Sequence, residues 1–344
     1  MGKRIAINGF GRIGRLTFRT LFEDKNVDIV AINDLTDEAT LAHLLKYDSA
    51  QGTFKDSKGK ELAITHGKGY IKVGAKTINV YAERDASQLP WAKEKIDLVI
   101  ESTGFYTTRE KAEAHIKAGA KKVVISAPAK GDLKTVVYGV NHKDLSKSDN
   151  IISGASCTTN CLTPIAAVLD KEFGIKSGFM TTVHAFTNDQ RTADAPHGDL
   201  RRARAASYNI IPTTTGAAVA VAKVLPQLEG KLDGMAMRVP VITGSVVDVV
   251  FTFDKKDVTV DKINAAIKKA SASATLKGVI GYTEDPIVST DVIGTQYATY
   301  FDASLTKQLT VENGDNSFKV ITWYDNEMSY VNQLCRTITH FIKL

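Results

Sequence analysis

The chain of 344 residues contains little cysteine: its 3 cysteines are Cys157, Cys161 and Cys335. An odd number of cysteines does not make a disulfide framework, and so few of them suit a reducing compartment. Cys157 and Cys161 lie one helical turn apart with no histidine close by in the sequence, so they make a poor zinc site. We therefore expect neither a structural disulfide nor a metal centre.

Long hydrophobic runs are also missing. No apolar run reaches the roughly 18 residues that a membrane-spanning helix needs. Residues 1–5, MGKRI, lead directly into a strand-like pattern and lack the apolar core of a signal peptide. The sequence therefore predicts a cytoplasmic protein with no membrane partner.

Neither sign of charge is in large excess. The chain has 44 Lys and Arg against 38 Asp and Glu, a net charge of +6 and a pI of about 9.0. A solvated, lysine-rich surface explains this excess, and a surface for nucleic acid or other anionic partners is the alternative. Because no basic stretch is interleaved with aromatic residues, nucleic-acid binding is not expected as the primary role.

The first ~150 residues contain short apolar strand patterns that alternate with helical patterns, and a chain of this length predicts two domains. Strands are expected at residues 4–8, 27–33, 96–102, 121–126 and 135–140, and helices at residues 12–22 and 108–118. Residues 50–85 resemble an antiparallel insertion. Alternation of this kind predicts an α/β fold with a doubly wound parallel sheet.

The second half has a different character. Strands with one covered face are expected at residues 179–186, 234–239, 245–253 and 318–324, and helices at residues 216–225, 260–270 and 326–344. This pattern predicts an α+β domain with a mostly antiparallel sheet. We predict a first domain of residues 1–156, completed by the C-terminal helix 326–344, and a catalytic domain of residues 157–325.

A glycine-rich loop follows the first expected strand. Gly9, Gly11 and Gly14 form a G-x-G-x-x-G pattern that opens a helix, and Asp34 ends the next strand. In a Rossmann-type domain these glycines allow a tight turn, the approach of a pyrophosphate and close packing of the helix. A carboxylate at Asp34 suits an adenosine ribose and repels a 2′-phosphate. The sequence therefore predicts an NAD site rather than an NADP site.

Cys157 is the candidate nucleophile. It follows the apolar pair Ile151 and Ile152 and precedes a helical pattern, so it is expected at a helix N-terminus, where the dipole favours a thiolate. A buried structural cysteine is the alternative interpretation. His184, on an expected strand, is a candidate base, although sequence spacing cannot bring it to Cys157. Pro164 should kink the helix that Cys157 begins.

Groups suited to phosphate lie further along the chain. They are the cluster Arg201, Arg202 and Arg204, the hydroxyl run at residues 213–215 before Gly216, and Arg238. Guanidinium groups and hydroxyls at a helix N-terminus both bind phosphate. An exposed loop or a subunit interface is the alternative role for the arginine cluster.

These motifs together resemble the glyceraldehyde-3-phosphate dehydrogenase family. The matching segments are INGFGRIGR at 7–15, SCTTNCL at 156–162, TVHAFTNDQ at 182–190, DLRRARAA at 199–206, IIPTTTGAA at 210–218, GKLDGMAMRVP at 230–240 and WYDNE at 323–327. They occur in family order from the N-terminal strand to the C-terminal helix, so the resemblance covers essentially the whole chain.

The resemblance implies roles for individual residues. Cys157 matches the nucleophile and His184 its activating base. Thr187 and Arg238 match groups that hold the phosphate of the substrate. Groups around the attacking inorganic phosphate are matched by Ser156, Thr158, Arg202, Thr215 and Gly216. Cofactor contacts are matched by Arg12, Ile13, Asp34, Arg84, Ser126 and Asn326, the last of these at the nicotinamide amide.

The resemblance also implies the reaction and its partners. Glyceraldehyde 3-phosphate is expected to be oxidised to 1,3-bisphosphoglycerate with NAD and inorganic phosphate, through a thiohemiacetal and a thioester on Cys157, in a homotetramer. An erythrose-4-phosphate dehydrogenase is the alternative on the same scaffold, and a secondary role in binding nucleic acid or surface partners stays open. Gly154, Met328 and Ser329 depart from the family pattern, and the last two lie beside Asn326.

Overall fold

The computed structural model describes residues 2–310 and 316–344, and the chain forms two compact units. Unit 1 combines the N-terminal segment up to Val136 with His142–Ala155 and Leu334–Leu344. Unit 2 consists of Val137–Asn141 and Ser156–Gln333. In the described ranges, none of the helices combines the length and the apolar character that crossing a membrane requires.

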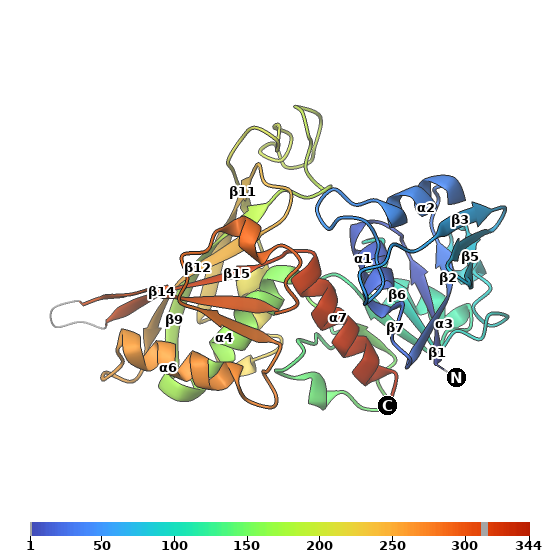
Figure 1. Cartoon of the computed structure of the whole chain (residues 1–344). Coiled ribbons are helices and arrows are strands. Elements are labelled where there is room, and N and C mark those ends of the chain that lie inside the picture. Colours follow the sequence, from blue (N-terminus) through green and yellow to red (C-terminus); the bar gives the residue numbers. More distant parts are fainter. Residues whose placement is uncertain (1, 311–315) are drawn as a thin grey trace. The chain divides into compact units, whose positions relative to one another are not determined.

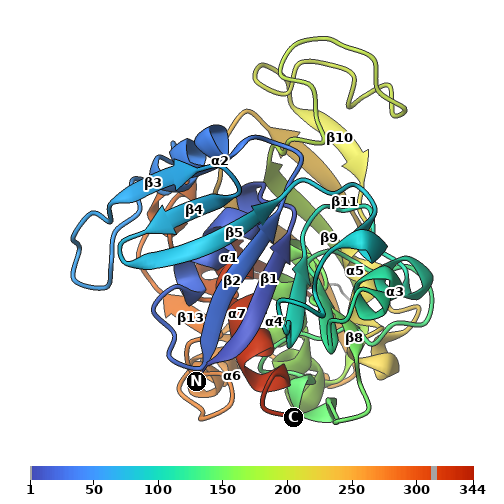
Figure 2. The same ribbon diagram turned by 90° about the vertical axis from the view of Figure 1, so that its right-hand side faces the viewer.

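Unit 1 is built on a sheet with the strand order β3-β4-β5-β2-β1-β6-β7-β8. Figure 2 shows β3, β4, β5, β2 and β1 side by side. The strands from β5 to β8 are parallel, whereas β3, β4 and β5 form the antiparallel insertion that was expected. The bounds of the strands are β1 (Lys3–Asn8), β2 (Val27–Asn33), β3 (Ile64–Gly67), β4 (Tyr70–Val73), β5 (Lys76–Tyr81), β6 (Leu98–Glu101), β7 (Lys122–Ile125) and β8 (Ile151–Ser153).

The helices of unit 1 connect parallel strands. They are α1 (Arg12–Leu21), α2 (Glu38–Lys46) and α3 (Arg109–Lys117). Helix α2 begins after Asp37 and helix α3 after Thr108, and each of these side chains accepts a backbone N–H of the first turn. The chain runs from β1 to β2 on one side of β1 and places β6 on the other side, so a topological switch point lies between β1 and β6. Ligands bind at the carboxyl ends of strands at such a point.

Unit 2 contains a mixed, mostly antiparallel sheet with the order β10-β11-β9-β12-β15-β14-β13. Figure 1 shows β9, β12, β15 and β14 side by side. The strands are β9 (Ile175–Ala185), β10 (Ile211–Thr214), β11 (Leu232–Val239), β12 (Ser245–Phe253), β13 (Ile280–Thr283), β14 (Thr299–Leu309) and β15 (Ser317–Tyr324). The α/β class with a parallel first sheet and a mostly antiparallel second sheet is thus as predicted.

Helix α4 (Cys157–Phe173) packs against this sheet beside α5 (Ala217–Val221) and α6 (Val260–Ser271). The helix continues through Pro164, which is buried, so the proline does not end it. Leu162, Ile165 and Leu169 of α4 are fully buried in the apolar core of unit 2. This burial offsets the backbone hydrogen bond that a proline removes, because packing supplies most of the stability of a helix in a protein.

Two local predictions were wrong. Residues 135–140 do not form a strand; only Thr135 makes an isolated bridge, to Ser153, and β8 occupies the sheet edge instead. The helix expected at 216–225 is limited to α5, and Thr213 and Thr214 of the hydroxyl run before it belong to β10. In both places a short apolar segment carries no periodicity that separates a strand from a turn or a helix.

The last helix, α7 (Met328–Phe341), begins in unit 2 and ends in unit 1. Gln333 Nε2 donates to the carbonyl of Gln296 at 2.7 Å, whereas Lys122 Nζ donates to the carbonyl of Phe341 at 2.8 Å. The boundaries of the two units therefore differ from the predicted domain boundaries: the boundary near the C-terminus falls within α7, and residues 137–141 belong to unit 2. Whether 1–156 with 326–344 and 157–325 fold as separate domains stays a prediction.

Candidate active site

Cys157 is the first residue of α4, and its side chain is only partly buried, whereas residues 158–166 are fully buried. The hydroxyl of Ser156 caps the helix by accepting the N–H of Thr159 at 3.1 Å. Before it, Ala155 has a φ of +60°, a conformation that costs a residue other than glycine about 1–2 kcal/mol. This strained turn places the sulfur at the positive end of the helix, where negative charge is stabilised.

His184 lies next to the end of β9, and its Nε2 atom is 3.3 Å from Sγ of Cys157. Its Nδ1 atom is 2.6 Å from the carbonyl oxygen of Ala185. Because a carbonyl only accepts hydrogen bonds, this contact favours the tautomer with the proton on Nδ1, whereas Nη1 of Arg238, 2.8 Å from the same atom, can only donate and favours the other tautomer. With the proton on Nδ1, Nε2 is the basic nitrogen that faces the sulfur.

The ionisation of this pair depends on burial and on Arg238. Burial raises the pKa of the Cys157 thiol, and the positive charge of Arg238 opposes this change. Burial, together with that same charge, lowers the pKa of His184 to about 3. At neutral pH a neutral imidazole therefore lies beside a thiol, and an imidazole in this state can accept a thiol proton.

Tyr324 is a component of the site that the sequence analysis missed. Its buried hydroxyl lies 2.8 Å from Oγ1 of Thr158 and 2.8 Å from Oγ1 of Thr182. Its ring meets that of His184 edge to face, with 5.8 Å between the ring centroids. Tyr324 is in the WYDNE segment, but no spacing in the sequence indicates contacts with residues more than 140 positions away.

The residues of unit 2 that were predicted to bind phosphate lie on several segments. Arg238, on β11, is partly buried, and its buried Nε atom has no hydrogen-bond partner within the described residues. Arg202 donates from Nε to Oγ1 of Thr213 at 2.9 Å and also forms an ion pair with Asp189. A buried guanidinium with an unpaired N–H is suited to an anionic ligand, whereas Arg202 already has an acidic partner.

The other residues that were predicted to bind phosphate lie near the ends of helices and strands of unit 2. Ser156 and Thr158 flank Cys157, and Thr187 follows β9. Thr215 Oγ1 accepts the N–H of Ala217 at 3.2 Å, and Gly216 precedes α5. Ser156 and Thr158 thus adjoin the sulfur in the sequence, and Arg238 contacts His184, with 2.8 Å between Nη1 and Nδ1.

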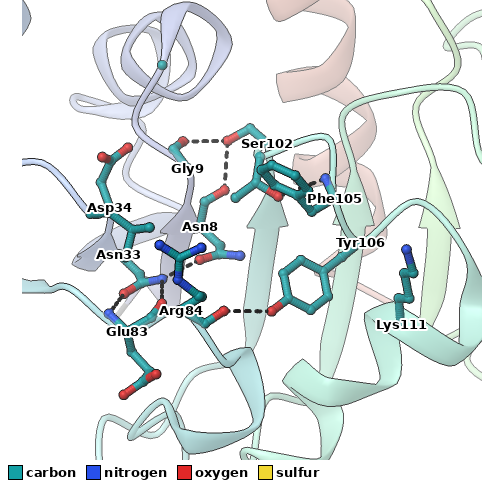
Figure 3. A pocket seen from close by; sticks show the side chains of 13 residues that line it. Asn8, Gly9, Asn33, Asp34, Glu83, Arg84, Ser102, Phe105, Tyr106 and Lys111 are labelled. Atoms are coloured by element: carbon teal, nitrogen blue, oxygen red, sulfur yellow. Dashed lines mark hydrogen bonds between the residues drawn. The ribbon is translucent and has the colours of Figure 1, made fainter. Parts of the chain in front are cut away.

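In unit 1, a pocket of about 650 Å³ lies at the switch point, at the carboxyl ends of β1, β2 and β6 (Figure 3). It is lined by Asn8, Gly9, Gly11, Asn33, Asp34, Leu35, Glu83, Arg84, Ser102, Thr103, Phe105, Tyr106 and Lys111. Of the predicted cofactor residues, Gly9, Gly11, Asp34 and Arg84 line this pocket. A cleft of this position and size suits a dinucleotide.

The three glycines of the loop have the geometry that this function requires. A Cβ atom on Gly9 would lie 2.7 Å from the backbone nitrogen of Thr103, and one on Gly14 would lie 2.1 Å from the carbonyl oxygen of Gly9. A Cβ atom on Gly11 would meet nothing within 4 Å. Gly9 and Gly14 are therefore required by close packing, whereas Gly11 keeps the start of α1 open to a phosphate group.

Several of the predicted cofactor residues of unit 1 also interact with other groups of the protein. Asp34 accepts the N–H of Phe10 at 2.7 Å, which leaves further acceptor capacity on its carboxylate. Arg12 forms an ion pair with Asp48, and Ile13 follows it in α1. Ser126, after β7, donates its backbone N–H to the carbonyl of Glu101 at 2.9 Å. The structure thus places Arg12, Ile13, Gly14 and Ser126 outside the residues that line the pocket.

Asn326 belongs to unit 2, where its side chain is fixed. Its Oδ1 atom accepts from the N–H of Gly244 at 3.1 Å, the hydroxyl of Ser245 at 3.0 Å and the hydroxyl of Thr243 at 3.2 Å. Because the N–H of Gly244 can only donate, the atom that faces it must be the amide oxygen. The NH₂ group of Asn326 is therefore the end left to donate to a ligand carbonyl.

Comparisons with known proteins agree with this division of the chain. Residues 3–109 match the family model described as glyceraldehyde 3-phosphate dehydrogenase, NAD binding domain, and residues 156–326 match the model for the C-terminal domain. The chain is 57% identical over 343 residues to a glyceraldehyde-3-phosphate dehydrogenase of Clostridium acetobutylicum, and 56% identical over 343 residues to one of Clostridium pasteurianum. Each alignment covers 99% of both chains.

Proposed function

The chain belongs to the glyceraldehyde-3-phosphate dehydrogenase family, and on this premise we propose that it oxidises D-glyceraldehyde 3-phosphate to 1,3-bisphosphoglycerate, with NAD and inorganic phosphate, in glycolysis. The observation that carries the proposal is the 3.3 Å contact between Sγ of Cys157 and Nε2 of His184 at the N-terminus of α4. A thiol next to a neutral imidazole is the arrangement that covalent catalysis on an aldehyde requires.

The first step forms a bond between the sulfur of Cys157 and the aldehyde carbon. The thiol proton passes to Nε2 of His184 and then to the former carbonyl oxygen, which gives a thiohemiacetal. The backbone N–H of Cys157 and the protonated imidazole stabilise the negative oxygen while it forms.

His184 acts again in the second step. It takes the hydroxyl proton of the thiohemiacetal while the hydrogen on the same carbon leaves as hydride, and a thioester on Cys157 remains. NAD, when bound, supplies the acceptor for that hydride. The neutral state of His184 at pH 7 follows from its lowered pKa and allows it to act as this base.

Inorganic phosphate completes the reaction. A phosphate oxygen attacks the thioester carbon, the bond between carbon and sulfur breaks, and the sulfur recovers the proton from His184. Arg238 and Thr187 are proposed to hold the phosphate of the substrate. Arg238 is supported in this role by its buried, unpaired Nε atom. Ser156, Thr158, Arg202, Thr215 and Gly216 are proposed to surround the attacking phosphate.

NAD is the cofactor of the chain. The residues of unit 1 fit it: Gly9, Gly11 and Gly14 shape the loop, and Asp34 lines the pocket with acceptor capacity for ribose hydroxyls. Arg12, Ile13, Arg84 and Ser126 are proposed as further contacts, and Asn326 as the group that binds the nicotinamide amide. The carboxylate of Asp34 disfavours the 2′-phosphate of NADP.

A homotetramer in the cytoplasm is part of the proposal. The long segment between β9 and β10 exposes Leu200, Tyr208 and Ile210, of which Tyr208 is 87% exposed. Apolar side chains grouped on an exposed segment are typical of a subunit interface. Arg201 and Arg204 lie on the same segment and are proposed to belong to that interface.

The reaction is tested by NADH formation from D-glyceraldehyde 3-phosphate with and without inorganic phosphate. We expect sustained NADH formation only with phosphate, and complete loss after a thiol-blocking reagent. Erythrose 4-phosphate and NADP serve as competing substrate and cofactor. The assignment is rejected if erythrose 4-phosphate gives the higher kcat/KM, or if NADH forms at the same rate after the thiols are blocked.

A further inference from the structure

A buried carboxylate lies at the end of β6, next to the pocket of unit 1. Glu101 is 1% exposed, and its two oxygens accept from groups on both sides. Oε1 accepts the N–H of Thr103 at 2.7 Å and also its hydroxyl. Oε2 accepts from Nδ2 of Asn8 at 2.6 Å and is 2.9 Å from Nε2 of His115. Four donors thus converge on one side chain.

The contacts of His115 fix its tautomer. The indole Nε1 of Trp91 is 3.0 Å from Nδ1 of His115, and an indole N–H can only donate. Nδ1 must therefore be an acceptor, so the proton of the neutral ring is on Nε2 and points to Glu101. Both rings are fully buried. His115 holds Glu101 from the side away from the pocket, because neither His115 nor Trp91 lines it.

On the other side the network continues into the pocket wall (Figure 3). Asn8 Oδ1 accepts from Nδ2 of Asn33 at 2.7 Å, and the same Nδ2 donates to the carbonyl of Glu83 at 2.8 Å. The N–H of Glu83 donates back to Oδ1 of Asn33 at 2.8 Å. Asn8, Asn33, Glu83 and Thr103 all line the pocket. One chain of hydrogen bonds therefore connects the ends of β6, β1 and β2 with the segment after β5.

We propose that Glu101 is a positioning residue for NAD, an inference that rests on the proposed function of the pocket. Glu101 does not line the pocket, but its carboxylate holds Asn8 and Thr103 and, through Asn33, the Glu83 segment. Four donors need a side chain with two acceptor oxygens and no N–H of its own, which an amide cannot provide. The carboxylate therefore fixes the distances between the pocket segments that carry Asn8, Thr103 and Glu83, and the dinucleotide must fit between these segments.

The direct test is Glu101→Gln in the full chain. The NH₂ group of the glutamine would face a donor group of Thr103, Asn8 or His115. Two donors cannot form a hydrogen bond, so one of the segments that line the pocket must move. We expect the Kd and the KM for NAD to rise about five- to tenfold, which corresponds to one unpaired buried group. The kcat at saturating NAD should change less than about twofold, because Cys157 and His184 are untouched. Glu101→Asp, which restores the carboxylate, should recover part of the affinity.

Glu94→Gln is the matched control. Glu94 is 9% exposed in the same unit, accepts from Nδ2 of Asn79 at 2.9 Å and from the hydroxyl of Tyr81 at 2.6 Å, and lies outside the pocket lining. The Glu94→Gln variant should lose stability as Glu101→Gln does, without a change in its Kd for NAD. His115→Phe is the second variant, to be used if Glu101→Gln does not fold. It removes one donor to Glu101 on the side away from the pocket and should also raise the KM for NAD at constant kcat.

The outcomes separate this inference from the function on which it rests. NAD titrated into the wild-type chain in a calorimeter without binding heat would refute the proposed cofactor site itself, and the inference with it. If the wild type binds NAD and Glu101→Gln or His115→Phe binds it equally well, only the positioning role is refuted. An equal loss of NAD affinity in Glu94→Gln also refutes it, because the effect would then be general destabilisation.

Discussion

Arg238 lies directly opposite His184 where β11 pairs in parallel with β9, and its Nη1 atom is 3.1 Å from the carbonyl oxygen of Ala185 that His184 also contacts. The guanidinium therefore adds a positive charge next to a buried imidazole and keeps that imidazole neutral. The same charge faces the sulfur and favours its thiolate. One side chain thus favours both the free base on His184 and the anion on Cys157.

Replacing Arg238 with methionine should change the pH dependence of the reaction. Removing a positive charge raises the pKa of His184, so the imidazole becomes protonated at a higher pH than in the wild type. The acid limb of kcat/KM should therefore move to higher pH, and the KM for the phosphorylated aldehyde should rise. Arg238→Lys keeps the charge and serves as the control. An unchanged acid limb in Arg238→Met would contradict the electrostatic role of this residue.

The three cysteines should differ sharply in reactivity. Cys157 is partly exposed beside His184, whereas Cys161 and Cys335 are buried and burial raises the pKa of Cys161 to about 12. We expect iodoacetamide to modify Cys157 first, with activity lost in proportion to its labelling, as mass spectrometry of peptides would measure. His184→Asn should slow this labelling at pH 7, because no base then takes the thiol proton. Prior labelling of Cys161 or Cys335 would speak against the assigned nucleophile.

Stability should depend on pH through His184. Its folded pKa of about 3 lies below the ordinary value of 6.5, so below pH 6.5 the unfolded chain binds a proton that the folded chain does not. This residue therefore stabilises the fold above pH 6.5, and that contribution is lost as the pH falls toward 3, by at most about 1.4 kcal/mol per pH unit. The His184→Asn variant lacks this pH-dependent contribution to the free energy of unfolding. Urea unfolding between pH 7 and 4.5 should therefore show a shallower fall for the variant, and equal slopes would contradict a buried neutral imidazole.

Tyr324→Phe should destabilise unit 2. Without the phenol, the buried hydroxyls of Thr158 and Thr182 lose a partner, which costs about 1–3 kcal/mol. Tyr282→Phe is the control, since its hydroxyl bonds the exposed Glu284 and its loss should cost little. Denaturant unfolding would measure both, and equal stabilities of the two variants would argue against the buried hydroxyl network.

Features that depend on neighbouring residues could be predicted from the sequence. The loop of Gly9, Gly11 and Gly14 lies between a strand and a helix as expected, and Cys157 begins a helix. Both depend on local signals: small residues where the backbone must turn or approach, and a serine that caps a helix. The continuity of α4 through Pro164 was not predictable, because it depends on a core assembled from distant strands.

Features that depend on the order of strands could not be predicted in this way. His184 meets Cys157 because β9 lies between β11 and β12, and no spacing along the chain encodes that order. The contact of Tyr324 with Thr158 depends on the same arrangement. The carboxylate of Glu101 shows the limit most clearly: Glu101 lies within an expected strand, but its partners Asn8 and His115 come from two other segments.

Mass spectrometry of the chain mixed with NAD and D-glyceraldehyde 3-phosphate in the absence of inorganic phosphate tests the central claim most directly. We predict rapid formation of about one equivalent of NADH per chain and a 3-phosphoglyceroyl adduct on Cys157, which added phosphate removes; Cys157→Ser should form neither. An adduct on another residue, or NADH formation by Cys157→Ser at a rate near that of the wild type, would contradict the thioester route.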